Sequence, residues 1–161
     1  MQGEPMPPKP IQAYYPEILN QCYGCGQENT HGHQIKSYWE NDKAIGRFTP
    51  EPYHTAIPGF VYGGLIASLI DCHGTGTACA AAYQAEGRAM DTAPPLRFVT
   101  ASLTVDYFKP TPIGVELVFV GQVEILKKSK VIVVVEVTAE GVLCAKGRVV
   151  AVPMPASMAP E

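Results

Sequence analysis

The sequence predicts one α+β domain in which a strongly curved antiparallel sheet covers a single long helix. The helix is expected over residues 63–83, where the side chains are apolar or small on nearly every side. Such a helix has to be covered by other structure all round. Several short segments with strand character follow it without a helix between them, which is typical of an antiparallel sheet. The length of 161 residues and the hydrophobic content of 47% fit a single folded domain.

The strands and loops follow from local patterns. Two short strands, 34–39 and 44–49, flank a polar hairpin, and a loop containing several prolines leads to the helix. After the helix, residues 86–95 are polar and bounded by proline, so we expect a loop. Later strands are separated by turns such as Glu140-Gly141. These later strands are expected at residues 96–108, 115–126, 131–138 and 142–152.

The composition excludes several classes of protein. Charged residues make up 17% of the chain, below the usual share of about 25%, and with the high hydrophobic content this excludes a disordered chain. The 12 Lys and Arg residues against 15 Asp and Glu give a net charge of -3, so no nucleic-acid partner is expected. No long uninterrupted apolar run is present, so no association with a membrane is expected either.

Both ends of the chain are rich in proline. Of the 15 prolines, five lie in the first sixteen residues and three in the last nine. We therefore expect a proline-rich amino-terminal arm over residues 1–17, a folded domain over 18–152 and a tail over 153–161. The amino terminus lacks the basic start and the apolar stretch of a signal peptide, and the five cysteines are an odd number. We expect a cytoplasmic protein with reduced thiols.

Cys22 and Cys25 form a C-x-x-C motif that is followed by His31 and His33. Three interpretations are open. A zinc site of this type usually needs four ligands, with the two histidines three to five positions apart rather than two. A redox dithiol would need a strand followed by a helix, which the neighbouring sequence does not show. We favour a tight turn in which the adjacent glycines supply unusual backbone angles, and no metal is expected.

Asp71 is the one acidic residue of the predicted helix. Burial of an ionised carboxylate without partners is costly, so Asp71 is expected to be paired, protonated or functional. A structural role is equally consistent with the sequence, with the carboxylate tied to His73, to a nearby Ser or Thr, or to a backbone amide. The residues by themselves leave both interpretations open.

Three segments of the sequence carry a family resemblance. Residues 22–32 (CYGCGQENTHG), 58–71 (PGFVYGGLIASLID) and 100–110 (TASLTVDYFKP) closely resemble the hotdog-fold acyl-CoA thioesterases, in the PaaI/4HBT-like group that includes the THEM4-like enzymes. The resemblance extends from about residue 22 to residue 152. It implies a helix wrapped by an antiparallel sheet, hydrolysis of acyl-CoA to a free acid and coenzyme A, and no cofactor other than the coenzyme A of the substrate.

The resemblance also implies roles for individual residues. Asp71 takes the place of the family's general base or nucleophile, and Thr100 that of the residue which places the water or the carboxylate. Gly63 and Gly64 match the two glycines of a His-Gly-Gly motif, and the backbone N–H of Gly63 would polarise the thioester carbonyl. Tyr62 stands where the family has histidine, and a neutral phenol is a poor proton carrier near neutral pH.

Other candidate substrate-binding residues have a structural alternative. His54 and His73 are candidates to compensate for Tyr62, although a structural role is favoured for each. Lys127 and Lys128 are candidates to bind the phosphates of coenzyme A, but a solvated hairpin tip is the favoured interpretation. Because of Tyr62, a non-catalytic hotdog protein that binds acyl-CoA or another small ligand remains the alternative function. A hotdog hydratase ranks last, because no matching Asp-to-His spacing is present.

The spacing of the candidate residues predicts an oligomer. Gly63 and Asp71 are eight residues apart, so they would lie about 12 Å apart along one helix. An amide donor and a base both have to lie within about 3 Å of the reacting groups. If both act on one carbonyl, they come from different subunits. The sequence therefore predicts a homodimer with two shared sites, and the resemblance allows a dimer of dimers.

Overall fold

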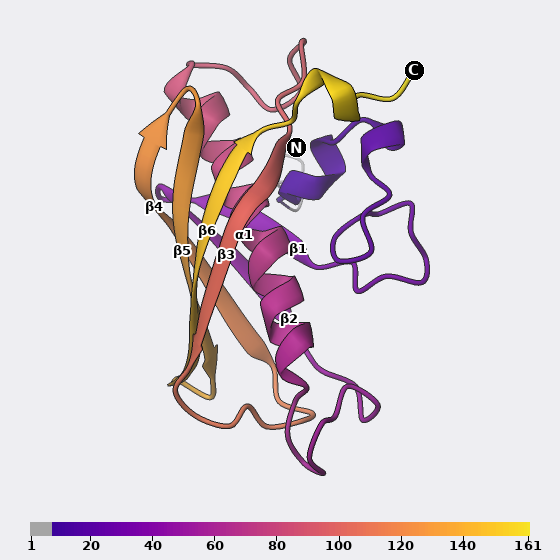
Figure 1. Cartoon of the computed structure of the whole chain (residues 1–161), viewed down its shortest axis with the longest axis vertical. Coiled ribbons are helices and arrows are strands. Elements are labelled where there is room, and N and C mark those ends of the chain that lie inside the picture. The colour runs from indigo at the N-terminus through magenta and orange to yellow at the C-terminus, as the bar shows by residue number, and fades with distance from the viewer. Residues whose placement is uncertain (1–7) are drawn as a thin grey trace, which may run out of the picture.

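The computed structural model describes residues 8–161 and shows one long helix on a six-stranded antiparallel sheet (Figure 1). The helix α1 spans Gly63–Ala85, and short 3-10 turns lie near both ends of the chain. The strands are β1 (Lys36–Glu40), β2 (Lys43–Phe48), β3 (Phe98–Tyr107), β4 (Leu117–Lys127), β5 (Lys130–Ala139) and β6 (Val142–Pro153). The 3-10 turns are η1 (Ile11–Tyr14), η2 (Glu17–Leu19) and η3 (Ala156–Met158). Every predicted strand and the predicted helix are thus present, with ends shifted by at most two residues.

The strand order shows which strands of the sheet have a side without a hydrogen-bonded neighbour. The order is β1-β2-β4-β5-β6-β3, and all neighbouring pairs are antiparallel. Tight turns join β1 to β2, β4 to β5 and β5 to β6; in the last of these Glu140 and Gly141 have φ angles of 50° and 78°. Within this sheet β1 and β3 are the edge strands, so β3 presents ten residues with one unpaired side.

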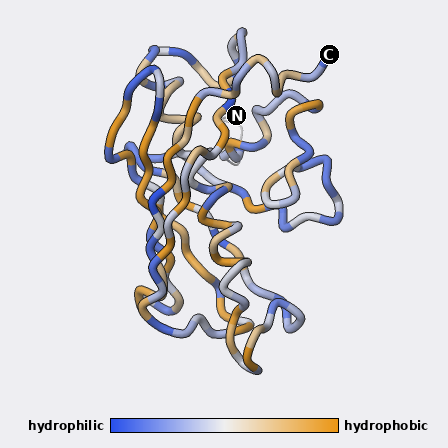
Figure 2. The backbone as a smooth tube through the Cα atoms, viewed as in Figure 1, coloured by the Kyte–Doolittle hydropathy of each residue, from blue (hydrophilic) through white to orange (hydrophobic). Residues whose placement is uncertain are grey.

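The helix is packed between the sheet and the amino-terminal segment (Figure 1). Figure 2 shows hydrophobic residues along the strands and on α1, whose Leu69 and Ile70 are fully buried. Close packing depends on small residues at the contact: a Cβ added to Gly74 would lie 2.5 Å from a methyl group of Val149 on β6. One face of the first half of α1 remains partly exposed, and it carries Gly64, Ala67, Ser68 and Asp71.

That open face departs from the expectation that the sheet would cover α1 on all sides. The four residues on it are three or four positions apart, so they share one side of the helix. Three of them are small, and together they leave a shallow surface around the single carboxylate. The fold class itself is confirmed: one central helix against an antiparallel sheet is an α+β hotdog arrangement.

The amino-terminal segment joins the core earlier than the sequence suggests. Part of this segment, predicted as an arm over residues 1–17, contributes Ile11 and Gln12, which are buried against the domain. The Gln12 side chain donates a hydrogen bond to Ser37 Oγ at 3.1 Å and accepts one from the Ser37 N–H at 2.9 Å. Burial of an apolar and an amide side chain outweighs the extended tendency of the prolines here. The prediction for residues 1–7 lies outside the described part of the chain.

The hydrogen-bond network continues from Gln12 through the middle of the fold. Ser37 Oγ lies 2.8 Å from Nδ1 of His73, and Nε2 of His73 lies 3.0 Å from the backbone oxygen of Ala44. A carbonyl can only accept, so the proton of the neutral ring is on Nε2 and Ser37 donates to Nδ1. Four segments (η1, β1, α1 and β2) are therefore joined by polar contacts that water does not reach.

No helix of residues 8–161 is both long enough and apolar enough to cross a membrane.

Candidate active site

Asp71 lies on the open face of α1 and is paired with a residue of the edge strand. It is half-buried, rather than enclosed as the sequence suggested, and the Thr100 hydroxyl of β3 donates a hydrogen bond to its Oδ1. Burial raises the pKa of the Asp71 carboxyl, and the hydrogen bond from Thr100 opposes that rise. The partner is thus Thr100 and not His73, and the second carboxylate oxygen is left for another contact.

Gly63 begins the helix, and the side chain before it does not cap the helix. Tyr62 is the N-cap residue and makes no side-chain cap hydrogen bond. The first N–H groups of a helix have no acceptor within it, and they lie at the positive end of the helix dipole. The carbonyl of Gly63 is held by the Tyr107 hydroxyl at 2.7 Å. This end of α1 therefore offers free backbone donors of the kind that stabilise a developing oxyanion.

Tyr62 is folded over the next glycine of the helix. The ring is 57% exposed, and a Cβ added to Gly64 would lie 2.5 Å from its outer atoms. A glycine at position 64 leaves room for this ring against the helix. Tyr62 also lies near Tyr107, whose pKa is raised by burial and by the neighbouring Tyr62 hydroxyl. The residue that departs from the family pattern thus belongs to the surface around the start of α1.

The two parts of the candidate site are separate within one chain. Gly63 and Asp71 are both on α1, as predicted, and eight residues of helix place them about 12 Å apart along the axis. Thr100 accompanies Asp71, whereas Tyr62 and Tyr107 accompany Gly63. One chain therefore does not bring the amide donor and the carboxylate to the same carbonyl carbon.

His54 belongs to an aromatic cluster beside this region. Its Nδ1 accepts a hydrogen bond from the Glu51 N–H at 2.9 Å, and its backbone oxygen accepts one from the Tyr62 N–H at 2.8 Å. The ring packs against His33 with centroids 5.4 Å apart. His33, Glu51 and His54 border a cavity of about 270 Å³. His54 thus supports the segment before the helix, and its ring is held by these neighbours.

His73 is fully buried, and both ring nitrogens are used within the protein. They contact Ser37 and the Ala44 carbonyl, as described above. Burial lowers the pKa of His73 to about 4, so the ring is neutral in the folded protein near neutral pH. Of the two interpretations open from the sequence, the structural one fits this position, because a substrate at the surface does not reach the ring.

Lys127 and Lys128 lie at the β4–β5 turn and border a cavity. That cavity has a volume of about 670 Å³ and also involves Arg97 and the end of α1. Its helix residue Ala82 is eleven positions after Asp71, which corresponds to about 17 Å along the helix. Only a long ligand could reach from these lysines to Asp71 of the same chain.

The C-x-x-C motif contacts α1 instead of the two histidines that follow it. Among the described residues, Cys22 and Cys25 come together with Cys72, and neither His31 nor His33 joins them. The neighbouring glycines are required for space and not for unusual angles, because neither has a positive φ. The expected turn is present, but its reason differs: the cysteines approach the helix closely. All five cysteines are free thiols.

These features place the chain in a known class of protein. The fold is the hotdog fold, and its helix carries a carboxylate on an open face and glycines at its start. The family model of the thioesterase superfamily, 4HBT, matches residues 58–146, which is more than half of the chain. The chain belongs to this superfamily, and the family resemblance stated from the sequence is confirmed.

Individual relatives agree with this assignment. A crystal structure of a thioesterase superfamily protein from Shewanella loihica is 50% identical, with a TM-score of 0.64 over 79% of this chain and 96% of that one. The acyl-coenzyme A thioesterase THEM4 of Xenopus laevis is 37% identical over 84 residues, which are 52% of this chain and 32% of that protein. The chain thus matches about a third of the length of this curated relative.

A more distant structure supports the fold alone. The PaaI protein of Escherichia coli, from a phenylacetic acid degradation operon, has a TM-score of 0.63 over 76% of this chain and 81% of that one, at 17% identity.

Sequence reasoning missed two residues of this region. The Tyr107 hydroxyl on the Gly63 carbonyl had no signal, because the contact joins residues 44 positions apart. Cys72 was counted as a small helix residue, and nothing in its spacing pairs it with a loop fifty residues earlier. Only its place beside Asp71 set it apart in the sequence.

Proposed function

We propose that this protein is an acyl-CoA thioesterase that hydrolyses a thioester to a carboxylic acid and free coenzyme A. The chain belongs to the thioesterase superfamily, and one observation in the structure supports the activity. The Thr100 hydroxyl donates a hydrogen bond to Asp71 on the open face of α1. The choice of acyl-CoA follows the Xenopus laevis relative, which is an acyl-coenzyme A thioesterase. Asp71, Thr100 and Gly63 are proposed as the residues that act on the thioester.

The chemistry proposed for Asp71 needs one free carboxylate oxygen. Thr100 occupies Oδ1, so Oδ2 can accept a proton from a water molecule as that water adds to the thioester carbonyl. Collapse of the tetrahedral intermediate breaks the C–S bond, and the departing thiolate of coenzyme A recovers the proton. In the alternative route Asp71 attacks the carbonyl directly, and water then cleaves the resulting anhydride. Both routes give the same products.

Stabilisation of the oxyanion is assigned to the start of α1 in a second subunit. The N–H of Gly63 has no acceptor within the helix and lies at the positive end of the helix dipole. Two features favour a partner at this surface. The edge strand β3 is long and unpaired on one side, and Tyr62 and Tyr107 are exposed large side chains beside Gly63. A homodimer, alone or doubled, is therefore proposed as the active unit.

The decisive experiment measures thiol release from a panel of short-chain, long-chain and aryl acyl-CoA substrates. We expect the wild type to hydrolyse at least one of them and Asp71→Asn to be slower by about 10²-fold or more. Asp91→Asn is the matched control, because Asp91 is an exposed carboxylate of the loop after α1. Equal rates for the wild type and Asp71→Asn would remove Asp71 from the mechanism.

A non-catalytic binding protein is the second candidate, and Tyr62 favours it. The phenol replaces the histidine of the family pattern, and it covers part of the helix start. In the same substrate panel, this candidate predicts binding of acyl-CoA without release of thiol from any substrate. Calorimetry with a non-hydrolysable acyl-CoA analogue distinguishes it from a protein that does not bind coenzyme A esters at all.

A further inference from the structure

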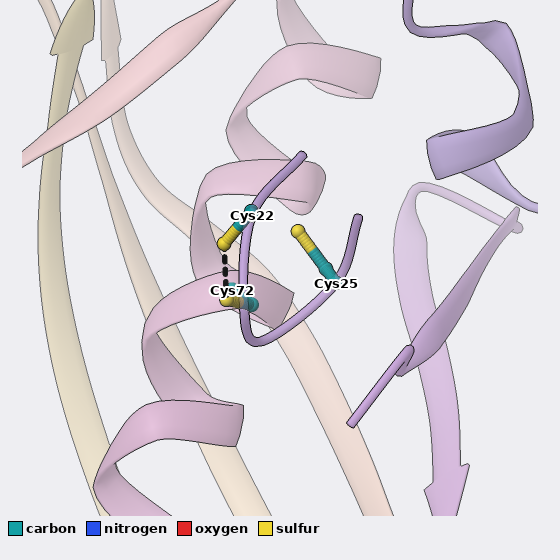
Figure 3. A group of neighbouring side chains, drawn as sticks. All are labelled: Cys22, Cys25 and Cys72. Carbon is teal, nitrogen blue, oxygen red and sulfur yellow. Dashed lines mark hydrogen bonds between the residues drawn. The ribbon is translucent and has the colours of Figure 1, made fainter. Parts of the chain in front are cut away.

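A cluster of three thiols connects the amino-terminal loop to the helix. Cys22 and Cys25 come from the loop after η2, and Cys72 comes from α1 (Figure 3). The three Sγ atoms all lie within 4.8 Å of one another. Cys22 is half-buried and the other two are buried. None of the three thiols has a part in the proposed hydrolysis, which uses Asp71, Thr100 and Gly63.

The distance between the sulfur atoms fits coordination of a metal ion. Cys22 Sγ and Cys72 Sγ lie 3.7 Å apart. In a tetrahedral zinc site the Zn–S bonds of about 2.3 Å place neighbouring sulfurs about 3.8 Å apart. A disulfide bond needs about 2.05 Å, so its formation would require the loop or the helix to move. The observed separation therefore matches one edge of a thiolate tetrahedron without rearrangement.

The loop is built to hold a thiolate at Cys22. The N–H of Gly24 donates to Cys22 Sγ at 3.4 Å. A side chain at position 24 is sterically excluded, because its Cβ would lie 2.3 Å from Cys72 Sγ. Glycine there allows the loop to approach the helix closely enough for three sulfurs to meet.

A cationic side chain lies on the same side of the core. Arg97 is half-buried, donates to the Phe98 carbonyl at 3.0 Å and stacks over the Tyr15 ring at 4.2 Å. None of the ion pairs among residues 8–161 involves Arg97. Three thiolates around a divalent cation carry a net charge of about -1. The Arg97 guanidinium, which has no carboxylate partner among residues 8–161, is therefore available to offset part of that charge.

We propose that Cys22, Cys25 and Cys72 bind one divalent cation of the zinc class through three thiolates. Binding changes no oxidation state: each thiol that becomes a ligand gives its proton to solvent, and the fourth coordination position is taken by water. The ion fastens the loop to α1 one residue after Asp71. This site lies beside the proposed active site, and its existence does not depend on the hydrolytic activity.

The test uses the reduced, metal-stripped full chain and Co²⁺ as a spectroscopic probe, with Zn²⁺ as competitor. We expect one Co²⁺ per chain, a thiolate-to-cobalt charge-transfer band, the visible bands of a tetrahedral site, and loss of all of these on addition of Zn²⁺. In the folded protein, stoichiometric Zn²⁺ should slow the reaction of Cys22 with a thiol reagent, because Cys22 is the half-buried thiol of the cluster. Absence of the bands in folded, reduced wild type would overturn the proposal.

Variants assign the ligands. Cys22→Ser is the first variant, because Cys22 is half-buried and its replacement is the least disruptive to folding. It should lose stoichiometric Co²⁺ binding, whereas Cys144→Ser, at a buried cysteine outside the cluster, should keep it. Circular dichroism confirms the fold of each variant. If Cys25→Ser or Cys72→Ser does not fold, protection of the thiols in wild type still decides the question.

Oxidation is the competing chemistry of three adjacent thiols. Treatment of the metal-free protein with hydrogen peroxide, followed by peptide mapping, detects a disulfide between Cys22 and either buried cysteine. Formation of that disulfide in a protein that also fails to bind Co²⁺ would assign the cluster to redox chemistry and reject the metal site. Protection of the same thiols from peroxide by stoichiometric Zn²⁺ would support the metal site.

Discussion

At Gly63 the functional group is the backbone amide and not a side chain, so the useful variants are those that alter the amide alone. Gly63 is the first helical residue after the N-cap Tyr62. Proline is well accepted at this position, and Tyr62 already has the extended backbone, with φ of -59° and ψ of 126°, that a following proline requires.

We predict that Gly63→Pro abolishes most of the activity, whereas Gly63→Ala retains it. Proline removes the N–H, and loss of one oxyanion donor costs about 10²- to 10³-fold in kcat. Alanine keeps the N–H, and its Cβ would meet Tyr107 at an ordinary contact distance of 3.5 Å. The measurement is kcat for both variants on the best substrate of the panel. Similar losses in the two variants would point to a steric effect and count against the amide.

His73 makes the stability of the fold dependent on pH. Its pKa is lowered to about 4 by burial, from a value of 6.5 for a free side chain. Between these values the unfolded chain binds the proton and the folded chain does not. Stability from this group is therefore complete above about pH 6.5 and is lost as the pH falls towards about 4, by roughly 3 kcal/mol in total.

We predict that the free energy of unfolding falls across this acidic range in the wild type and falls less in His73→Gln. Chemical denaturation at a series of pH values measures it, and two-dimensional NMR of the imidazole follows the protonation of His73 directly in the wild type. Protonation of the ring in the folded protein at its ordinary pKa would contradict the prediction, and it would do so even if the variant proved too unstable to study.

At the scale of elements, α1 packs closely against the sheet only because glycine occupies the positions where a larger side chain would collide with a strand. Gly74 faces Val149, and an added Cβ would lie 2.5 Å and 2.8 Å from two of its atoms. Gly76 lies on the same helix, and there the nearest atom to an added Cβ would be the Gln12 amide nitrogen, at 3.2 Å. The two glycines thus differ in crowding while they share the same helical backbone.

We predict that Gly74→Ala is less stable than Gly76→Ala by about 1 to 3 kcal/mol. Both variants gain about 1 kcal/mol from the helix propensity of alanine, so their difference isolates the collision with Val149. Urea denaturation of the two variants and the wild type gives the comparison. Equal stability of the two variants would show that β6 moves aside at little cost.

The sequence predicts helices and strands better than it predicts which parts of the chain pack against them. The strands and α1 are confirmed because alternation, turn residues and an apolar helix are local signals. Burial of Ile11 was missed, because local prolines say nothing about a surface formed by distant strands. The place of Asp71 on the helix was correctly expected, yet its half-open surroundings depend on which side of α1 the sheet leaves uncovered.

At the scale of the whole molecule, the proposed site is complete only when two chains meet. The amide of Gly63 and the carboxylate of Asp71 are about 12 Å apart on one α1. The unpaired side of β3 and exposed aromatic residues such as Phe108, which is 55% exposed, are surfaces that a second copy could cover.

We predict that two inactive variants, Asp71→Asn and Gly63→Pro, regain activity when they are refolded together. A mixed dimer has one site with both groups intact and one with neither, so random pairing gives about a quarter of the wild-type activity. Light scattering establishes that the chains associate, and the assay is repeated on each variant refolded alone. Absence of rescue in proven mixed dimers would contradict the shared site.

The polar network of Gln12, Ser37 and His73 has a consequence for anyone who shortens the chain. A protein that started at residue 18, the border suggested by the prolines, would lack the amide that satisfies Ser37 at 3.1 Å and 2.9 Å. Both hydrogen bonds would be lost, at a cost of about 0.5 to 1.5 kcal/mol each. The folded unit therefore includes Gln12, and its hydrogen bonds to Ser37 show this more directly than the proline content of the sequence does.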